Sequence, residues 1–139
     1  MKIKIKKLNP NCIIPSYAHP GDAGLDLYSL EDYELKPGER KRFDLGFALE
    51  FPQGYVALTR DRGSLSTQAI HNVGGVFDCT YRGEYNCSLI NLSDKTFAIK
   101  KGDRIAQLII FPIAYAELEE SNELSPTSRG DGRFGSTGK

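Results

Sequence analysis

The feature that most constrains the fold is an alternation of apolar side chains near the middle of the chain. Apolar residues occupy every second position there: Phe43, Leu45, Phe47, Leu49 and Phe51. Because successive side chains of a β-strand point to opposite faces, this spacing predicts strand structure with one buried face. No stretch repeats apolar residues at helical spacing over three turns, so we expect an all-β protein.

Further strands are predicted where aromatic and β-branched residues gather. They cover the alternation of Ile3 and Ile5 with lysines, and residues 85–90, 96–99 and 105–111. Turn sequences separate them, at Pro20-Gly21, Pro37-Gly38, Pro52-Gln53-Gly54, Arg82-Gly83 and Lys101-Gly102-Asp103. Many short strands at this spacing are typical of a sandwich, jelly roll or barrel. Residues 66–71 and 116–124 could each form a helical turn or two.

Composition limits the functions open to the chain. Its 139 residues suit one domain, and 18 basic against 18 acidic residues give no net formal charge. Nucleic-acid binding is therefore not expected, because proteins that hold a phosphate backbone usually carry a basic excess. A small anionic ligand remains open. No apolar window is long enough for a membrane span, and the N-terminus lacks the apolar stretch of a signal peptide.

The cysteines indicate a reducing compartment. Cys12, Cys79 and Cys87 are odd in number and include no CxxC pair, which argues against a disulfide framework or a zinc site. We therefore expect a cytoplasmic protein, or one of the host cytoplasm or nucleus if the source is viral.

The last fifteen residues differ from the rest of the chain. The segment 125–139 (SPTSRGDGRFGSTGK) is rich in glycine and hydroxyl residues, with Phe134 as its single aromatic. Composition alone is typical of a flexible tail. The sequence thus predicts a β domain over residues 1–124 and a C-terminal arm over residues 125–139.

Two short motifs in the first half could bind anions or metals. In residues 23–27 (AGLDL), Asp26 stands between two leucines, so its carboxylate should point away from the face that they bury. In residues 62–65 (RGSL), Arg62, Gly63 and Ser64 offer a guanidinium, a free amide and a hydroxyl, all of which donate hydrogen bonds to phosphate oxygens. Taken alone, each motif is more often a turn or surface loop.

The segment 72–84 (NVGGVFDCTYRGE) is the most informative. Arg82-Gly83 is interpreted as a hairpin turn, and Asp78 on one arm could serve as a general base for water. Tyr81 would present a ring beside it, and the amide of Asn72 offers the donor and acceptor that a pyrimidine edge requires. The alternative is a decorated hairpin with a solvated aspartate, in which the cysteines only pack.

Two further motifs lie in the second half. Gln107 in residues 102–108 (GDRIAQL) is polar within an apolar strand, so its amide needs a ligand or backbone partners. Residues 129–138 (RGDGRFGSTG) combine glycines, hydroxyls and arginines that could wrap phosphates through backbone amides. They lack the GK[ST] ending of a Walker A sequence.

In this order, the five motifs AGLDL, RGSL, GVFDCTYRGE, GDRIAQL and RGDGRFGSTG resemble those of the trimeric dUTPase family over nearly the whole chain. The resemblance implies a β-clip or jelly-roll-like barrel with a flexible Gly-rich C-terminal arm. It also implies a homotrimer with active sites shared between subunits, and Mg²⁺ as cofactor. The implied reaction is hydrolysis of dUTP to dUMP and pyrophosphate, which limits uracil incorporation into DNA and supplies dUMP for dTMP synthesis.

The resemblance also assigns roles to residues. Asp78 would activate the water that attacks the α-phosphorus, and Asp26 would hold Mg²⁺ through water. Tyr81 would pack under the deoxyribose and exclude a 2′-hydroxyl. The substrate-binding positions that it implies are Arg62, Gly63, Ser64 and Gln107 for phosphates, Asn72, Val76 and Phe77 around the base, Asn86, and Arg129, Phe134, Gly135, Ser136 and Thr137 in the arm.

Three features depart from the family pattern. Gly63 and Ser64 are exchanged relative to the usual order, and the interval from Arg62 to Asp78 is shorter than expected. Arg133 stands where a glycine usually precedes the arm's phenylalanine.

Two other functions are alternatives to this one. A dCTP deaminase, alone or combined with dUTPase activity, shares the fold but needs a glutamate near the exocyclic amine, and only Glu84 stands near the matching place. A non-catalytic binding module is disfavoured by the intact set Asp26, Asp78, Tyr81 and Phe134.

Overall fold

The structure is a computed structural model that describes residues 1–133, and within them it is almost entirely β. A four-stranded sheet has the order β2 (Leu25–Tyr28), β11 (Arg104–Pro112), β6 (Tyr55–Arg60), β8 (Val76–Asp78). A three-stranded sheet has the order β4 (Arg40–Asp44), β9 (Asn86–Asn91), β7 (Ile70–Asn72). Two pairs complete the fold: β1 (Lys4–Lys7) with β5 (Phe47–Glu50), and β10 (Phe97–Ile99) with β3 (Tyr33–Leu35). Every pairing is antiparallel, and the all-β prediction is confirmed.

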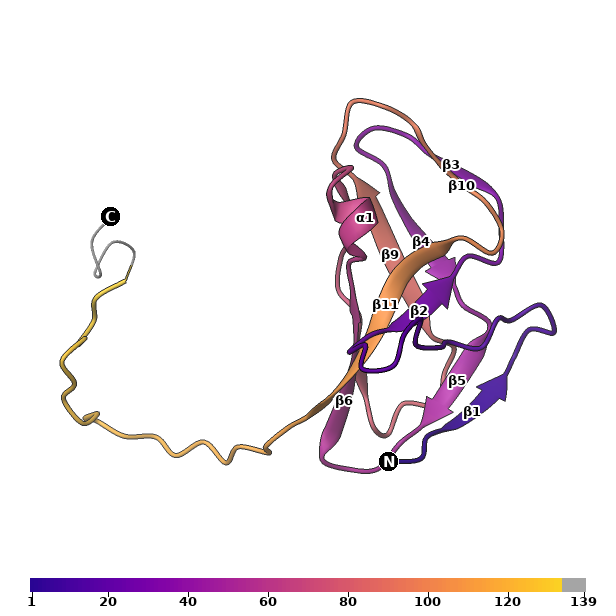
Figure 1. The fold of residues 1–139 in the computed structure, drawn as a ribbon. Helices are drawn as coiled ribbons and strands as arrows, with labels where there is room; N and C mark the ends of the chain where they lie inside the picture. Colours follow the sequence, from indigo (N-terminus) through magenta and orange to yellow (C-terminus); the bar gives the residue numbers. More distant parts are fainter. Residues whose placement is uncertain (134–139) are drawn as a thin grey trace.

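The long strand β11 organises the larger sheet (Figure 1). Its Gln107 lies opposite Asp26 of β2 on one side and Arg60 of β6 on the other. The register along β6 continues to Pro112 opposite Tyr55. Strands were predicted at 105–111, 96–99 and 85–90, and β11, β10 and β9 confirm them within one or two residues at each end.

The alternating run of residues 43–51 is buried as predicted, but it is not one strand. Leu45 and Gly46 separate β4 from β5, and the two strands pair with β9 and β1 respectively. Gly46 has φ = +74°, a backbone conformation that bends the chain and that L residues rarely adopt. The run therefore buries its face while crossing from one sheet to another.

Three local predictions are wrong. Arg82-Gly83 is not the turn of a hairpin, because β8 pairs with β6 whereas β9 pairs with β4 and β7. The helical turn lies earlier than 66–71: α1 spans Gly63–Ser66, and Ala69 ends the turn at φ = +58°. Residues 116–124 form no helix, since they pack against nothing that would offset the cost of nucleating one.

Three aromatic rings tie the sheets together. Tyr85 is fully buried between Phe47 of β5, with ring centroids 5.3 Å apart, and Phe77 of β8, with centroids 4.2 Å apart. Both pairs are stacked, a geometry that adds to the burial of their apolar area. Burial raises the pKa of the Tyr85 phenol, whose oxygen has no hydrogen-bond partner among the described residues.

After β11 the chain leaves the body of the fold. Residues 113–133 contain neither strand nor helix, and Figure 1 shows them leading away from the sheets. The last attachments are at the start of this segment, where Ile113 N–H donates to Gly54 O and Gly54 N–H donates to the Tyr115 hydroxyl. None of the helices described is long and apolar enough to cross a membrane.

Substitution of Gly46 tests how tightly the chain is packed where it passes from β4 to β5. A Cβ there would lie 2.8 Å from Asn9 Cβ and 2.9 Å from Leu30 Cδ1, whereas Gly38 has the same φ of +74° and nothing within 4 Å. We expect Gly38→Ala to cost about 1–2 kcal/mol of unfolding free energy from backbone strain alone. Gly46→Ala should cost at least about 1 kcal/mol more, because its Cβ also meets packed atoms. Urea denaturation of both variants measures this, and equal losses would contradict it.

Candidate functional site

Three of the five motifs meet in one polar cleft of about 400 Å³. It is formed by the loop before β2, the start of β2, α1 and β11. The residues that line it are Ala18, His19, Asp22, Ala23, Gly24, Asp26, Arg62, Gly63, Ser64, Arg104 and Gln107. The structure therefore brings together the predicted phosphate positions and Asp26, which lie far apart in the sequence.

Asp26 sits between two guanidinium groups in the polar cleft. Its Oδ1 lies 3.2 Å from Arg62 Nε, and its Oδ2 lies 3.4 Å from Arg104 Nε. The residue is only 8% exposed, and a carboxylate so far out of water is costly unless cations pair with it. The side chain points away from the buried Leu27, as the alternation predicts. Sequence reasoning missed Arg104, although it stands inside the GDRIAQL motif.

Arg62 is held in place by more than Asp26. Its Nη1 donates to Arg104 O at 3.1 Å and lies 3.5 Å from Ser64 Oγ. Gly63 begins α1, with nothing within 4 Å of where its Cβ would be. The guanidinium, the hydroxyl and this open backbone therefore face one cleft, whichever of Gly63 and Ser64 meets a phosphate.

Gln107 is the polar residue that the strand pattern singled out. Its Nε2 donates to Asp61 O at 2.7 Å, so backbone satisfies the donor end of the amide. Gly24 lies directly against the other end, since a Cβ on residue 24 would come within 2.1 Å of Gln107 Oε1. The glycine of the AGLDL motif is thus required by this close approach.

Asp78 lies in a different place, which we call the aspartate pocket, of about 500 Å³. Its lining residues are Phe51, Gln53, Tyr55, Asp78, Cys79, Thr80, Arg82, Ile113 and Tyr115. Asp78 is exposed, and its carboxylate takes part in no hydrogen bond or ion pair among residues 1–133. Such a carboxylate is open to water.

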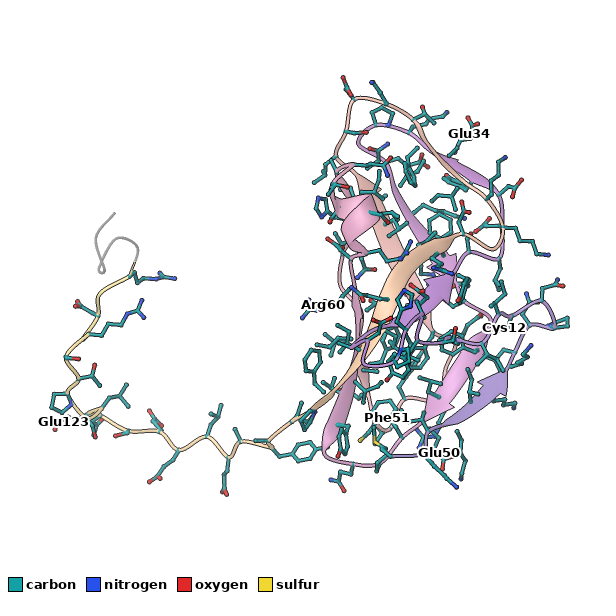
Figure 2. All side chains as sticks on the ribbon, in the orientation of Figure 1. Cys12, Glu34, Glu50, Phe51, Arg60 and Glu123 are labelled. Carbon is teal, nitrogen blue, oxygen red and sulfur yellow. The ribbon has the colours of Figure 1, made fainter. Side chains whose placement is uncertain are left out.

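The aspartate pocket and the polar cleft belong to opposite ends of β6. Asp78 pairs with Val56, whereas Gln107 pairs with Arg60. Four residues of strand separate those partners by about 13 Å. Figure 2 shows Arg60 and, well below it, Phe51 of the aspartate pocket.

The turn 73–75 connects β7 to β8. Asn72, the asparagine predicted to meet a base, ends β7 just before this turn. Asn72 Nδ2 lies within 3.2 Å of Thr59 O, Thr59 Oγ1 and Gly74 O. Because carbonyl oxygens can only accept, the amide must present its Nδ2 to them and its Oδ1 elsewhere. Asn72 Oδ1 is buried and has no hydrogen-bond partner in the described part of the chain. Such an orphaned acceptor calls for a donor from a ligand or an ordered water.

The side chains that follow alternate between solvent and core. Val76 is 69% exposed, whereas Phe77 is buried against Tyr85. Gly75, at φ = +90°, approaches Thr59 so closely that a Cβ would fall 1.6 Å from the hydroxyl oxygen. The backbone of this turn is thus fixed against β6 while Val76 faces outward.

Tyr81 presents a partly open ring. It is 40% exposed, donates its hydroxyl to Glu84 O at 3.1 Å, and its ring centroid lies 5.8 Å from that of Phe77. A Cβ on Gly83 would come within 2.3 Å of the Tyr81 hydroxyl, so the ring rests on this glycine. Glu84 Oε1 accepts the Gly46 N–H at 2.8 Å, so the one acid near the deaminase position is bound to backbone.

The remaining predicted positions are less informative. Asn86 begins β9 opposite Asp44 and lines neither pocket. Arg129 is exposed, and its Nε donates to Gly132 O at 3.0 Å within the segment that leaves the body. Phe134, Gly135, Ser136 and Thr137 lie outside the described residues.

Among residues 1–133, the remaining candidates for chemistry are the cysteines and the possible metal ligands. All three thiols are free, and burial raises the pKa of Cys87 to about 12, which favours a packing role. Within residues 1–133, no group of three or more His, Cys, Asp or Glu side chains is arranged to hold a metal ion. The carboxylates in the polar cleft are Asp22 and Asp26.

Comparison with known proteins gives one consistent result. Residues 10–138 match the family model described as dUTPase. The chain is 49% identical to the deoxyuridine 5'-triphosphate nucleotidohydrolase of Nautilia profundicola over 100% of both chains. It is 45% identical to that of Hydrogenobaculum sp. over 99% of each.

Solved structures show the same fold. A mutant dUTPase of Staphylococcus bacteriophage 80alpha, described with dUpNHpp, matches with a TM-score of 0.92 at 29% identity over 99% of both chains. A mutant dUTPase of phage phi11 of S. aureus, described as coordinating a structural Mg(II) ion, matches with a TM-score of 0.83 at 25% identity, over 91% of this chain and 100% of that one. The expected jelly-roll-like fold of the dUTPases is thereby confirmed.

Proposed function

The chain belongs to the dUTPase family and acts as a dUTP nucleotidohydrolase, and on this premise we propose that Asp78 activates the attacking water. The open Asp78 carboxylate in the aspartate pocket carries this proposal. Asp26 is unsuited to the role because guanidinium groups already occupy both of its oxygens. The water attacks the α-phosphorus, and dUMP and pyrophosphate leave. Position and charge stabilisation supply most of the remaining catalysis in such a reaction.

The polar cleft is the site for the triphosphate. Arg62, Ser64 and Gln107, with the open backbone at Gly63, offer the donors that phosphate oxygens accept. Two acidic residues, Asp22 and Asp26, balance two basic ones, Arg62 and Arg104, so the charged side chains of the cleft sum to zero. A bound triphosphate would therefore leave excess negative charge, which a cation must neutralise.

Mg²⁺ fits this requirement. It usually keeps several waters and binds through one or two carboxylates together with substrate phosphates, a mode that needs no cage of protein ligands. Because both oxygens of Asp26 are paired with arginines, Asp26 would hold the ion through water. When bound, Mg²⁺ neutralises charge on the phosphate oxygens.

The base and sugar meet the turn that follows β7. Asn72 Oδ1 is an acceptor without a partner, and the N3–H of uracil is a donor that could satisfy it directly or through water. The backbone at Val76 and Phe77 supplies further contacts to the base, and Asn86 is a further proposed substrate-binding position. The ring of Tyr81 packs under the deoxyribose.

The arm closes over the bound nucleotide in this proposal. Phe134 stacks on uracil, while Arg129, Gly135, Ser136 and Thr137 hold the γ-phosphate. The separation of residues 113–133 from the sheets supports an arm that reaches beyond its own domain. We also propose a cytoplasmic location, which the three free thiols support.

Two of these residues give direct tests. We expect Asp78→Asn to bind dUTP nearly as well as the wild type but to turn it over at least about 10²-fold more slowly, because asparagine keeps the size and loses the basic oxygen. Steady-state kinetics and calorimetric binding of a non-hydrolysable analogue measure the two effects. A near-normal kcat would rule out Asp78 as the base.

Tyr81 should set the preference for deoxyribose. The wild type should reject UTP, because a ring packed on the sugar leaves no room for a 2′-hydroxyl. Tyr81→Ala should relax that rejection, and Tyr81→Phe, which keeps the ring and loses only the bond to Glu84 O, should retain it. The ratio of kcat/KM for dUTP and UTP measures the preference, and an equal ratio in wild type and Tyr81→Ala would show that Tyr81 only packs.

We propose a homotrimer with shared sites, and the separation along β6 supports the sharing. Since about 13 Å of strand lies between the partners of Asp78 and Gln107, one chain's aspartate pocket is best completed by the polar cleft of a neighbour. We expect Asp78→Asn and Gln107→Ala to be impaired when each is alone. Mixed trimers, refolded from equal amounts, should regain about a quarter of the wild-type sites, because random assembly joins two intact halves that often. A mixture no more active than its components would refute the shared site.

A further inference from the structure

Asp61 occupies a connecting position that none of the assignments above uses. It lies between β6 and α1, immediately before Arg62. Its side chain faces β7 and its carbonyl faces β11, so one residue contacts both Asn72, proposed to meet the base, and Gln107, proposed to meet phosphate. Asp61 and the ring of His71 are both about one-third exposed.

The first contact holds the backbone of Asn72. Asp61 Oδ1 accepts the Asn72 N–H at 2.5 Å. The next amide, Val73 N–H, donates to Ser88 O of β9. Because successive N–H groups of a strand point to opposite sides, the Asn72 N–H faces the free edge of β7, where no strand of residues 1–133 pairs with it. The Asp61 carboxylate accepts this N–H instead, at the point where the turn 73–75 begins.

The second contact fixes the carboxylate itself. Asp61 Oδ2 lies 2.7 Å from His71 Nδ1. A carboxylate can only accept, so the imidazole donates through Nδ1 and holds the second oxygen. With both oxygens bonded to neighbouring residues of β7, the carboxylate keeps one orientation.

The third contact uses the backbone only. Asp61 O accepts Gln107 Nε2 at 2.7 Å, and this bond does not depend on the side chain at position 61. Asp61 also does not cap α1, whose first turn has no side-chain cap. Removing the carboxylate should therefore disturb Asn72 selectively and leave the phosphate-binding cleft in place.

We propose that Asp61, braced by His71, is a positioning residue for base recognition. It fixes the main chain of Asn72, and Thr59 and Gly74 fix the side-chain amide, so that Oδ1 is held as an acceptor. An acceptor in a fixed place favours a base that donates at N3, such as uracil, over cytosine, whose N3 accepts. The inference rests on the proposed contact between Asn72 and the base.

The test compares binding of dUDP and dCDP by calorimetry in the full-length protein. We expect Asp61→Ala to weaken dUDP binding at least about tenfold, roughly the loss of one hydrogen bond to a charged group, and dCDP binding by much less. Asp61→Asn should recover most of the affinity, because its Oδ1 accepts from Asn72 and its Nδ2 donates to the other tautomer of His71. KM for dUTP should rise in Asp61→Ala while kcat stays within about threefold, since Asp78 is untouched.

Controls separate this role from a structural one. Asp94→Ala removes an exposed carboxylate in the turn between β9 and β10 and should change neither affinity. Thermal melts follow the stability of each variant. Asp61→Ala overturns the inference if it weakens both nucleotides equally or leaves dUDP binding unchanged, whatever its melting temperature.

Asn72→Ala distinguishes the inference from the function on which it rests. If the wild type does not prefer dUDP, or if Asn72→Ala keeps the preference, the base assignment of Asn72 fails and the inference fails with it. If Asn72→Ala loses the preference and Asp61→Ala keeps it, only the role of Asp61 is refuted.

Discussion

The pairing of β6 with β11 is the constraint on which the rest of the structure depends. Six consecutive residue pairs, from Gln107 opposite Arg60 to Pro112 opposite Tyr55, fix the two strands in one register. A slip of one residue would turn the side chains of β11 to the other face and expose the core residues Ala106 and Leu108. The same register sets the separation between the polar cleft and the aspartate pocket. One register therefore sets both the packing of the core and the distance between the polar cleft and the aspartate pocket.

The polar cleft contains a buried charge. Asp26, almost out of water, is retained between Arg62 and Arg104, and losing one partner would leave a charge uncompensated. The pairing also supports the different roles proposed for two aspartates of similar intrinsic chemistry. Asp26 is committed to cations and suited to organising phosphate and metal, whereas Asp78 stands open to water. Their surroundings, rather than their residue type, assign the roles.

Close approaches of backbone give the site its rigidity. Gly24 lies against Gln107, Gly75 against Thr59 and Gly83 against Tyr81, each at a distance that leaves no room for a Cβ. Gln107 and Tyr81 of the proposed site, and Thr59, which bonds to Asn72, are thereby each held by a glycine of the motifs. Asp61 also fixes backbone, but through a hydrogen bond. Its carboxylate accepts the Asn72 N–H at the edge of β7 that has no strand partner among residues 1–133. A substrate then meets groups that are already oriented, which reduces the ordering that binding must offset.

The sequence by itself determined the fold class and the family, and it named most of the residues that are proposed for the site. The apolar alternation depends only on the local geometry of a strand, and each of the five motifs is a short continuous stretch of sequence. The sequence could not reveal the break between strands at Gly46, because the alternation continues unchanged through that residue. It also suggested a hairpin at Arg82-Gly83, because a turn sequence does not specify which strands pair. Nor could it reveal Arg104 beside Asp26, or Asp61 beside Asn72, since such contacts join separate parts of the chain. Only the tertiary structure decided that Asp78 of β8 and Gln107 of β11 lie beside opposite ends of β6, because that distance comes from long-range pairing and register.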